Sequence, residues 1–168
     1  VLISQAIHTL DLMLSLTGPV ASVQAVCATT PLHKMQAEDV PAGAMQFANG
    51  AVGAPFASTA SFPGEAESLH FDFDHAAATL QSGVLTVHWR DGRVESFGGE
   101  AAGTGGGADP MAFPFDWHQS MIADFAEAIS EGRDPRVTGK MALDVHRLIA
   151  ALEKSSREGR RIDLEIMT

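Results

Sequence analysis

Hydrophobic and polar positions recur along the chain with two different periods. Residues 4–17 carry apolar side chains at helical spacing and contain no proline, and Gly18-Pro19 follows. This pattern predicts a helix that ends at residue 17. Residues 20–29 alternate in the manner of a strand, and residues 31–41 are a polar connection. The chain is therefore expected to open with a helix followed by a strand.

The middle of the chain has the pattern of short strands joined by tight turns. Asn49-Gly50 separates two alternating runs and is the strongest short signal for a β-hairpin. Ser82-Gly83 and Asp91-Gly92 supply further turns. The predicted strands are 44–48, 51–61, 69–73, 77–80, 84–89 and 93–97.

Two amphipathic helices close the chain. The first is predicted from Asp116 to Gly132, with Gln119 completing a capping box, and the second from Thr138 to Gly159. A last strand is predicted at 162–166. Strands followed by helices favour the α+β class, with an open-faced, largely antiparallel sheet that has helices on one face. The uncovered face would then be a surface for self-association.

A glycine-rich segment, residues 98–114, separates the strands from these helices. Within it, Gly103 to Ala108 fits the pattern G-x-G-x-x-G/A. That fingerprint binds a dinucleotide only between a strand and a helix, and here Asp109-Pro110 follows instead. We therefore interpret this segment as a loop and not as a cofactor site.

Composition narrows the possible partners. The 168 residues are enough for one domain, and the net charge of −10 argues against nucleic acid or an anionic membrane as a partner. No apolar run approaches the roughly 20 residues that span a bilayer. A single cysteine, Cys27, excludes an intrachain disulfide and suits a cytoplasmic protein. The first residue is not Met and no signal peptide is visible, so we expect a piece of a longer chain.

The first helix carries the best candidate chemistry. At about 100° per residue, Ser4, His8, Asp11 and Ser15 fall within a strip of about 60°. A solvated face is usually broader, so we expect a helix buried on most sides with one narrow polar strip. His8 and Asp11 are spaced to contact each other, and a carboxylate that fixes the imidazole tautomer suits acid/base chemistry. The residues alone leave open a structural His–Asp pair or a solvated strip. The remaining histidines lack partners at metal-ligand spacing, so no metal site is predicted.

Both ends of the chain resemble a known family. The stretch "SQAIHTLDLMLSLTGPVASVQA", from Ser4 to Ala25, is similar to the opening of the C-terminal domain of the glucose–fructose oxidoreductase / inositol dehydrogenase / MocA (Gfo/Idh/MocA) family, which reads roughly D-x-G-x-H-x-x-D before an apolar helix. Met121 to Leu164 resembles the closing helices of that domain, with their E-G-R-x-P turn. The middle fits only through its run of strands.

The resemblance implies the substrate-binding and oligomerisation half of an NAD(P)-dependent oxidoreductase acting on a sugar, polyol or similar small molecule. NAD or NADP would be bound mainly by an N-terminal Rossmann domain, which is absent from residues 1–168 together with its catalytic Lys. The isolated chain is therefore expected to be inactive. The resemblance also implies assembly into a homodimer or homotetramer through the sheet face.

The resemblance assigns roles to three residues. His8 matches the family's catalytic His, and Asp11 matches the acidic position that orients this His or binds a sugar hydroxyl. Ser4 matches a position that is often Asp; it can bind a hydroxyl but cannot act as a base near neutral pH. A non-catalytic oligomerisation or ligand-binding domain on the same fold is the alternative, and the serine at this position favours it.

Overall fold

The computed structural model describes residues 1–99 and 115–165. It has antiparallel sheets and three α-helices, which confirms the α+β class. The chain divides into two compact units, one formed by Val1–Phe62 with Val137–Thr168 and the other by Pro63–Arg136. Apart from Gly98 and Gly99, the glycine-rich segment lies outside the described residues, and so does its G-x-G-x-x-A match.

The first unit joins the two ends of the chain in one sheet. Its strands pair antiparallel in the order β3-β2-β1-β8, so the last strand lies beside the first. Its elements are a π-helical turn η1 (Leu2–Ala6), α1 (Ile7–Thr17), β1 (Val20–Ala28), β2 (Val40–Phe47), β3 (Val52–Gly53), α3 (Gly139–Glu158) and β8 (Ile162–Asp163).

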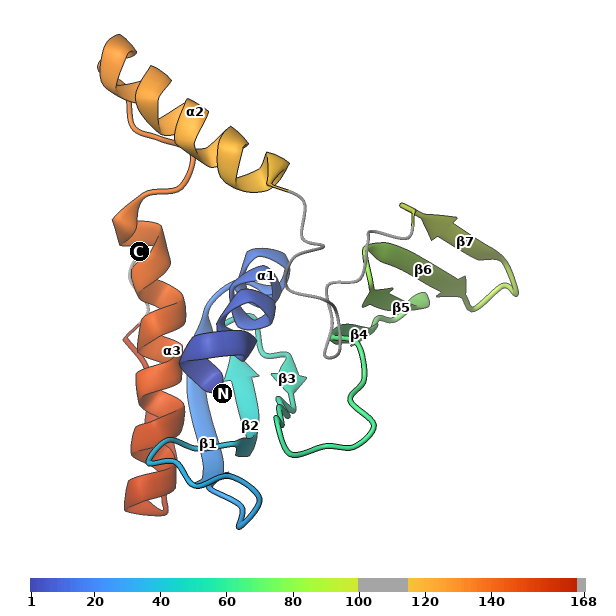
Figure 1. The fold of residues 1–168 in the computed structure, drawn as a ribbon. Helices are drawn as coiled ribbons and strands as arrows, with labels where there is room; N and C mark the ends of the chain where they lie inside the picture. The colour runs from blue at the N-terminus through green and yellow to red at the C-terminus, as the bar shows by residue number, and fades with distance from the viewer. Residues whose placement is uncertain (100–114, 166–168) are drawn as a thin grey trace. The chain divides into compact units, whose positions relative to one another are not determined.

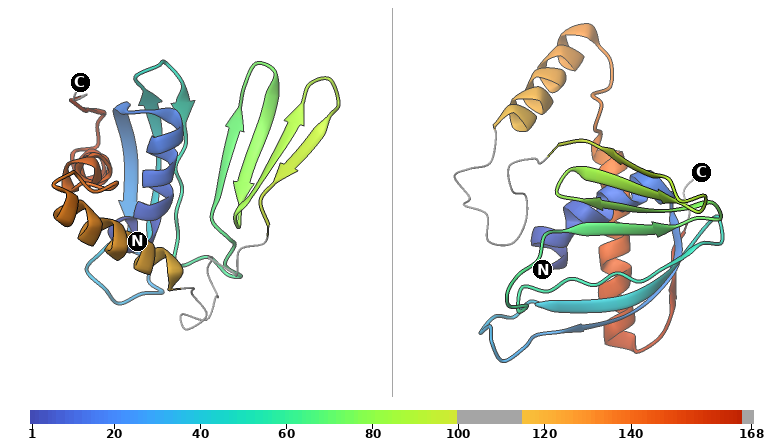
Figure 2. Two further views of the ribbon diagram at one scale, coloured as in Figure 1. Left: turned by 90° about the horizontal axis from the view of Figure 1, so that it is seen from above. Right: turned by 90° about the vertical axis from the view of Figure 1, so that its right-hand side faces the viewer.

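The core of this unit lies between α3 and β1. Helix α3 packs along β1 and also contacts α1 (Figures 1 and 2). The helix buries Val145, Leu148 and Leu152, and the sheet buries Val23 and Met45, which are direct cross-strand partners. Alternate residues of a strand point to opposite faces, so Val26 and Val52 lie on the other face and are 68% and 81% exposed.

Two serines of α3 complete the hydrogen bonding of β1. Strand β8 pairs only with Ser22 and Val23, so the edge of β1 beyond them has no strand partner. The Ser155 hydroxyl accepts from the Ala25 N–H at 3.0 Å and donates to the Arg160 carbonyl at 2.6 Å. The Ser156 hydroxyl accepts from the Cys27 N–H at 2.8 Å. These bonds matter because an unpaired buried N–H is costly.

The connection between β1 and β2 is organised around one buried carboxylate. Asp39 is fully buried and accepts from the Thr30 N–H at 2.7 Å, the Thr30 hydroxyl at 2.6 Å and the His33 ring at 2.8 Å. Burial opposes ionisation, but the hydrogen bonds from Thr30 and His33 outweigh it and lower the pKa of Asp39 to about 2. Its backbone N–H and carbonyl bond to Ala28 and Thr59.

The second unit is a four-stranded meander with one helix. Strands pair antiparallel in the order β4-β5-β6-β7 (Figure 2). The elements are β4 (Ser68–Asp72), β5 (Ala76–Gln81), β6 (Val84–Trp89), β7 (Val94–Phe97) and α2 (Asp116–Glu131). The cross-strand register places apolar side chains on one face and mostly polar ones on the other. The apolar face is made of Leu69, Phe71, Ala76, Ala78, Leu80, Leu85, Val87, Trp89 and Phe97, and it also carries Glu95.

Helix α2 ends in a network around one arginine. Arg133 forms ion pairs with Asp124 at 3.1 Å, Glu127 at 3.0 Å and Glu131 at 2.7 Å. Asp124 also accepts from the Arg136 N–H at 2.8 Å. These contacts fold the E-G-R-x-P segment back onto the last turns of the helix.

The local signals of the sequence predict most elements, with corrections at several of their boundaries; β2, for example, begins at Val40 and not at residue 44. Asp116 is the first helical residue of α2 and forms no capping hydrogen bond, because Phe115 occupies the N-cap position. The strand expected at 51–61 contracts to β3 and an isolated bridge from Phe56 to Ala42. Of the strand expected at 162–166, β8 covers Ile162–Asp163, and residue 166 lies outside the described residues. Thr138 caps α3 as predicted, accepting from the Met141 N–H. Gly159 ends that helix in the left-handed conformation, with φ of 64°.

We predict that Ser155→Ala lowers the free energy of unfolding by about 1–3 kcal/mol, because the buried Ala25 N–H and Arg160 carbonyl lose their partner. Urea unfolding followed by circular dichroism measures this. Ser130→Ala, an exposed serine within α2 that bonds only to its own helix, serves as the control and should change the value by less than about 0.5 kcal/mol. Equal effects of the two variants would contradict the role given to Ser155.

We predict that the stabilising effect of Asp39 disappears in acid. The folded pKa of about 2 lies below the ordinary value of 3.8, so the contribution is complete above about pH 4 and is lost as the pH falls through about 2. Urea unfolding of the wild type and Asp39→Asn between pH 6 and pH 2 should show the stability difference shrinking. A difference that stays constant to pH 2 would rule out ionised Asp39 as its cause.

Candidate functional site

The candidate residues lie at the start of the first helix, across a change of helix type. Ser4 lies in the π-helical turn η1, whereas His8 and Asp11 lie in α1. The helix begins at Leu2, two residues earlier than predicted, and the wider turn alters the angle between Ser4 and His8 that a uniform α-helix would give. Short π-helical segments occur frequently at functional sites.

All three candidate side chains are exposed, on a face that also carries apolar residues. Ser4, His8 and Asp11 are exposed together with Ile3, Leu12 and Leu16, the last 56% exposed. Within α1 only Leu10 and Met13 are buried. The expectation of a helix buried on most sides is therefore wrong for this chain. A polar strip flanked by uncovered leucines is instead typical of a surface that another part of a protein covers.

The expected contact between His8 and Asp11 is not formed. Within the described part of the chain, no hydrogen bond or ion pair joins their side chains, although both lie on one face of α1. The imidazole is therefore available to a ligand hydroxyl, and the Asp11 carboxylate can accept a second hydroxyl. The arrangement offers one group able to carry a proton and two able to bind hydroxyls.

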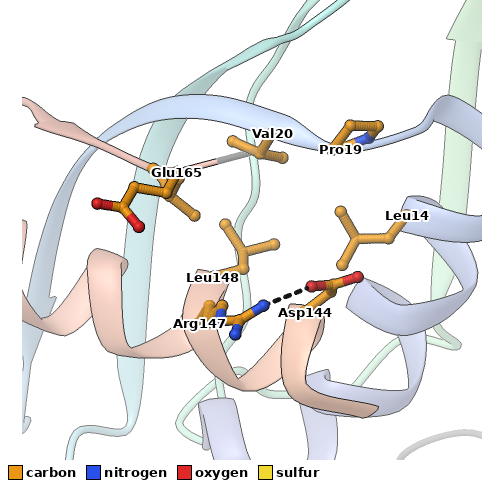
Figure 3. A pocket seen from close by; sticks show the side chains of 8 residues that line it. Leu14, Pro19, Val20, Asp144, Arg147, Leu148 and Glu165 are labelled. Carbon is orange, nitrogen blue, oxygen red and sulfur yellow. Dashed lines mark hydrogen bonds and ion pairs between the residues drawn. The ribbon is translucent and has the colours of Figure 1, made fainter. Parts of the chain in front are cut away.

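A small pocket lies at the other end of α1, away from His8. Leu14, Pro19 and Val20 line it together with residues of α3 and the C-terminal segment (Figure 3). Two of its charged members, Asp144 and Arg147, form an ion pair with each other at 3.1 Å, and the third is Glu165. Its volume is about 50 Å³, well below the roughly 300–1,000 Å³ of ligand pockets. It is too small to hold a sugar.

A second hollow, in the other unit, has two arginines that are engaged in internal contacts. Its volume is about 330 Å³, and it is lined by His75, Trp89, Arg90, Asp91 and Arg93. The Arg93 guanidinium stacks over the Trp89 ring at 5.0 Å and bonds to Asp91 at 2.8 Å. Arg90 donates to the Asp74 carbonyl at 2.7 Å. These internal contacts stabilise the end of the sheet and leave few donors for a ligand.

The described residues offer no dedicated cofactor or metal site. No group of three or more His, Cys, Asp or Glu side chains that could hold a metal occurs between residues 1 and 99 or between 115 and 165. The glycine-rich connection from β7 to α2 lies mostly outside the described residues. None of the helices described is long and apolar enough to cross a membrane.

Comparison with known families gives a match at the N-terminal end that includes the candidate residues. The model of the GFO/IDH/MocA C-terminal domain matches residues 1–106 of 168. The chain belongs to the GFO/IDH/MocA family. The predicted family is thus confirmed, and Ser4, His8 and Asp11 lie within the matched range. No curated protein matches the chain significantly.

Solved structures with the same fold include oxidoreductases. A levoglucosan dehydrogenase in complex with NADH and levoglucosan has 20% identity and a TM-score of 0.76, over 98% of this chain and 50% of its own. An Agrobacterium radiobacter oxidoreductase, in complex with NAD⁺, L-tartaric acid and magnesium, has 23% identity and a TM-score of 0.70, over 94% and 47%. The WlbA dehydrogenase from Bordetella pertussis, in complex with NADH and UDP-GlcNAcA, has 23% identity and a TM-score of 0.62, over 96% and 44%. This GFO/IDH/MocA chain therefore spans half the length, or less, of these three proteins.

Two contacts that hold the first helix in place cannot be predicted from the sequence. Glu38 and Asn49 bond to the two ends of the first helix, yet both are distant from it along the chain. No spacing rule links residues 36 positions apart, so only the folded chain reveals these contacts.

Proposed function

We propose that residues 1–168 form the substrate-binding and oligomerisation half of a cytoplasmic, NAD(P)-dependent oxidoreductase. The reaction would transfer hydride between the nicotinamide and a hydroxyl-bearing carbon of a sugar, polyol or related small molecule. Membership of the GFO/IDH/MocA family supports this proposal. So do the ligands of the similar structures, since levoglucosan, L-tartaric acid and UDP-GlcNAcA all carry hydroxyl groups.

The observation that carries the proposal is the shared exposed face of Ser4, His8 and Asp11. When the substrate alcohol is oxidised, its carbon loses a hydride and its hydroxyl loses a proton. The His8 imidazole would take that proton and return it in the reverse direction. Asp11 and Ser4 would bind neighbouring hydroxyls and hold the reacting carbon in place.

The cofactor would be held outside this chain. When bound, the nicotinamide supplies or accepts the hydride. The residues described here lack a pyrophosphate-binding turn, so their part is to bind substrate, move the proton and exclude water. Ile3, Leu12 and Leu16 surround the polar strip and could pack against a cofactor-binding domain. The chain alone is accordingly expected to have no turnover.

A second candidate is a non-catalytic ligand-binding or oligomerisation domain. Ser4 favours it, because the hydroxyl replaces a carboxylate that members of the family often have. The absence of a His8–Asp11 hydrogen bond points the same way. In that case the strip would bind a hydroxylated ligand without any proton transfer.

We predict that His8→Ala lowers kcat of the full-length protein about 100- to 10,000-fold, the usual contribution of a general acid or base. The assay follows NAD(P)H absorbance with a panel of sugars, polyols and hydroxy acids. The control is His146→Ala, an exposed histidine on α3, which should leave kcat unchanged. If His8→Ala retains kcat on the best substrate, the non-catalytic alternative is favoured.

Self-association would use the apolar face of the second sheet, defined above. Phe97 lies on that face and is 54% exposed, whereas its neighbour Ser96 lies on the polar face. We predict a homodimer or homotetramer by light scattering, which Phe97→Lys shifts towards monomer and Ser96→Lys does not. A wild-type protein that stays monomeric at high concentration would contradict this part of the proposal.

A further inference from the structure

The first helix lacks a cap from its own sequence and receives one from a distant carboxylate. Neither η1 nor α1 has a side-chain hydrogen bond from its own N-cap residue. Instead the Leu2 N–H donates to Glu38 Oε1 at 2.7 Å. The Val1 nitrogen donates to the Glu38 carbonyl at 2.8 Å. A carboxylate here satisfies free N–H groups and interacts favourably with the helix dipole.

The other end of the helix is tied to the same strand. The Asn49 side-chain amide donates to the Thr17 carbonyl at 3.2 Å, and the Ala48 N–H donates to the Pro19 carbonyl at 2.9 Å. Glu38 precedes β2 and Asn49 follows it. The helix is therefore attached at its two ends to the two ends of β2.

Glu38 is itself held firmly in place. Its neighbour Asp39 is fully buried and bonded to Thr30 and His33, which fixes the backbone at this point. The carboxylate is a strong hydrogen-bond acceptor for the Leu2 N–H.

These polar contacts carry weight because apolar packing of the helix is limited. From Leu2 to Thr17, only Leu2, Leu10 and Met13 are buried. Ser4 and His8 lie in the turns next to the Glu38 contact, and the N–H groups of Gln5 and Ala6 both bond to the Val1 carbonyl. Loss of the cap would release the turn that carries Ser4 and leads into His8.

We infer that Glu38 is a positioning residue, which caps the first helix from the start of β2 and so sets where Ser4 and His8 lie. Its structural role stands on the contacts above. Its effect on catalysis rests on the proposed function. Separate experiments test the structural role and the catalytic effect of Glu38, so that one can be disproved while the other holds.

Hydrogen exchange of the chain tests the structural role. Glu38→Ala should raise the exchange rates of the Gln5 and Ala6 amides about tenfold, whereas Glu38→Gln, which keeps an acceptor oxygen, should stay close to wild type. Glu65→Ala removes an exposed glutamate in the other unit and should change neither amide. If Glu38→Ala does not fold, Glu38→Asp, one carbon shorter, replaces it with the same expectation. Wild-type exchange in the folded variant would overturn the inference.

Turnover of the full-length protein tests the catalytic consequence. Glu38→Ala should lower kcat about tenfold or more with a smaller change in KM, and Glu38→Gln should restore most of it. If His8→Ala abolishes turnover while Glu38→Ala leaves kcat unchanged, the positioning of His8 by Glu38 is overturned. If His8→Ala has no effect, the proposed function fails, and the exchange experiment alone decides the role of Glu38.

Discussion

The packing of α3 against β1 is the interaction on which the first unit depends. It joins the two ends of the chain, and its apolar layer of Val23, Leu148 and Leu152 is fully buried. Apolar packing alone does not fix the position of a helix along a strand, and the hydrogen bonds of Ser155 supply this constraint. Because its hydroxyl bonds both to β1 and to the chain just past α3, it fixes the register of the helix along the strand. Sheet, helix and final strand are thereby locked into one arrangement.

The position of the candidate site depends on this packed sheet and helix. Strand β1 pairs with β2 along its whole length, and β2 in turn carries at its ends the two residues that tie down the first helix. The helix is thus held mainly by its termini, with little of its surface buried. Such an arrangement leaves a broad face for a ligand or another domain, which is what a substrate site completed by a cofactor domain requires.

Local signals in the sequence predict helices, strands and turns well, but they predict the burial and contacts of individual side chains less well. Thr138, Gly159 and Asn49-Gly50 mark their helix ends and turn correctly because capping and turn formation involve only neighbouring residues. The family resemblance selects His8 as a candidate but says nothing of its surroundings. The prediction that His8 lies in a narrow polar strip on a buried helix is wrong. Periodicity identifies apolar positions on a helix, but it does not show whether they are buried inside the same domain or exposed on its surface. Glu38 escapes prediction for a similar reason, since its partner is brought near only by the fold.

The most direct test of this site is the accessibility of the α1 face in the longer protein. The variant Leu12→Cys, in a Cys27→Ser background, places one thiol a helical turn from His8, where a thiol reagent can label it. If a cofactor domain and substrate complete the site, the labelling rate should fall about tenfold or more between the chain alone and the full-length protein with NAD(P)H bound. Equal rates in the two would show that α1 faces solvent throughout and would contradict its role as a wall of the active site.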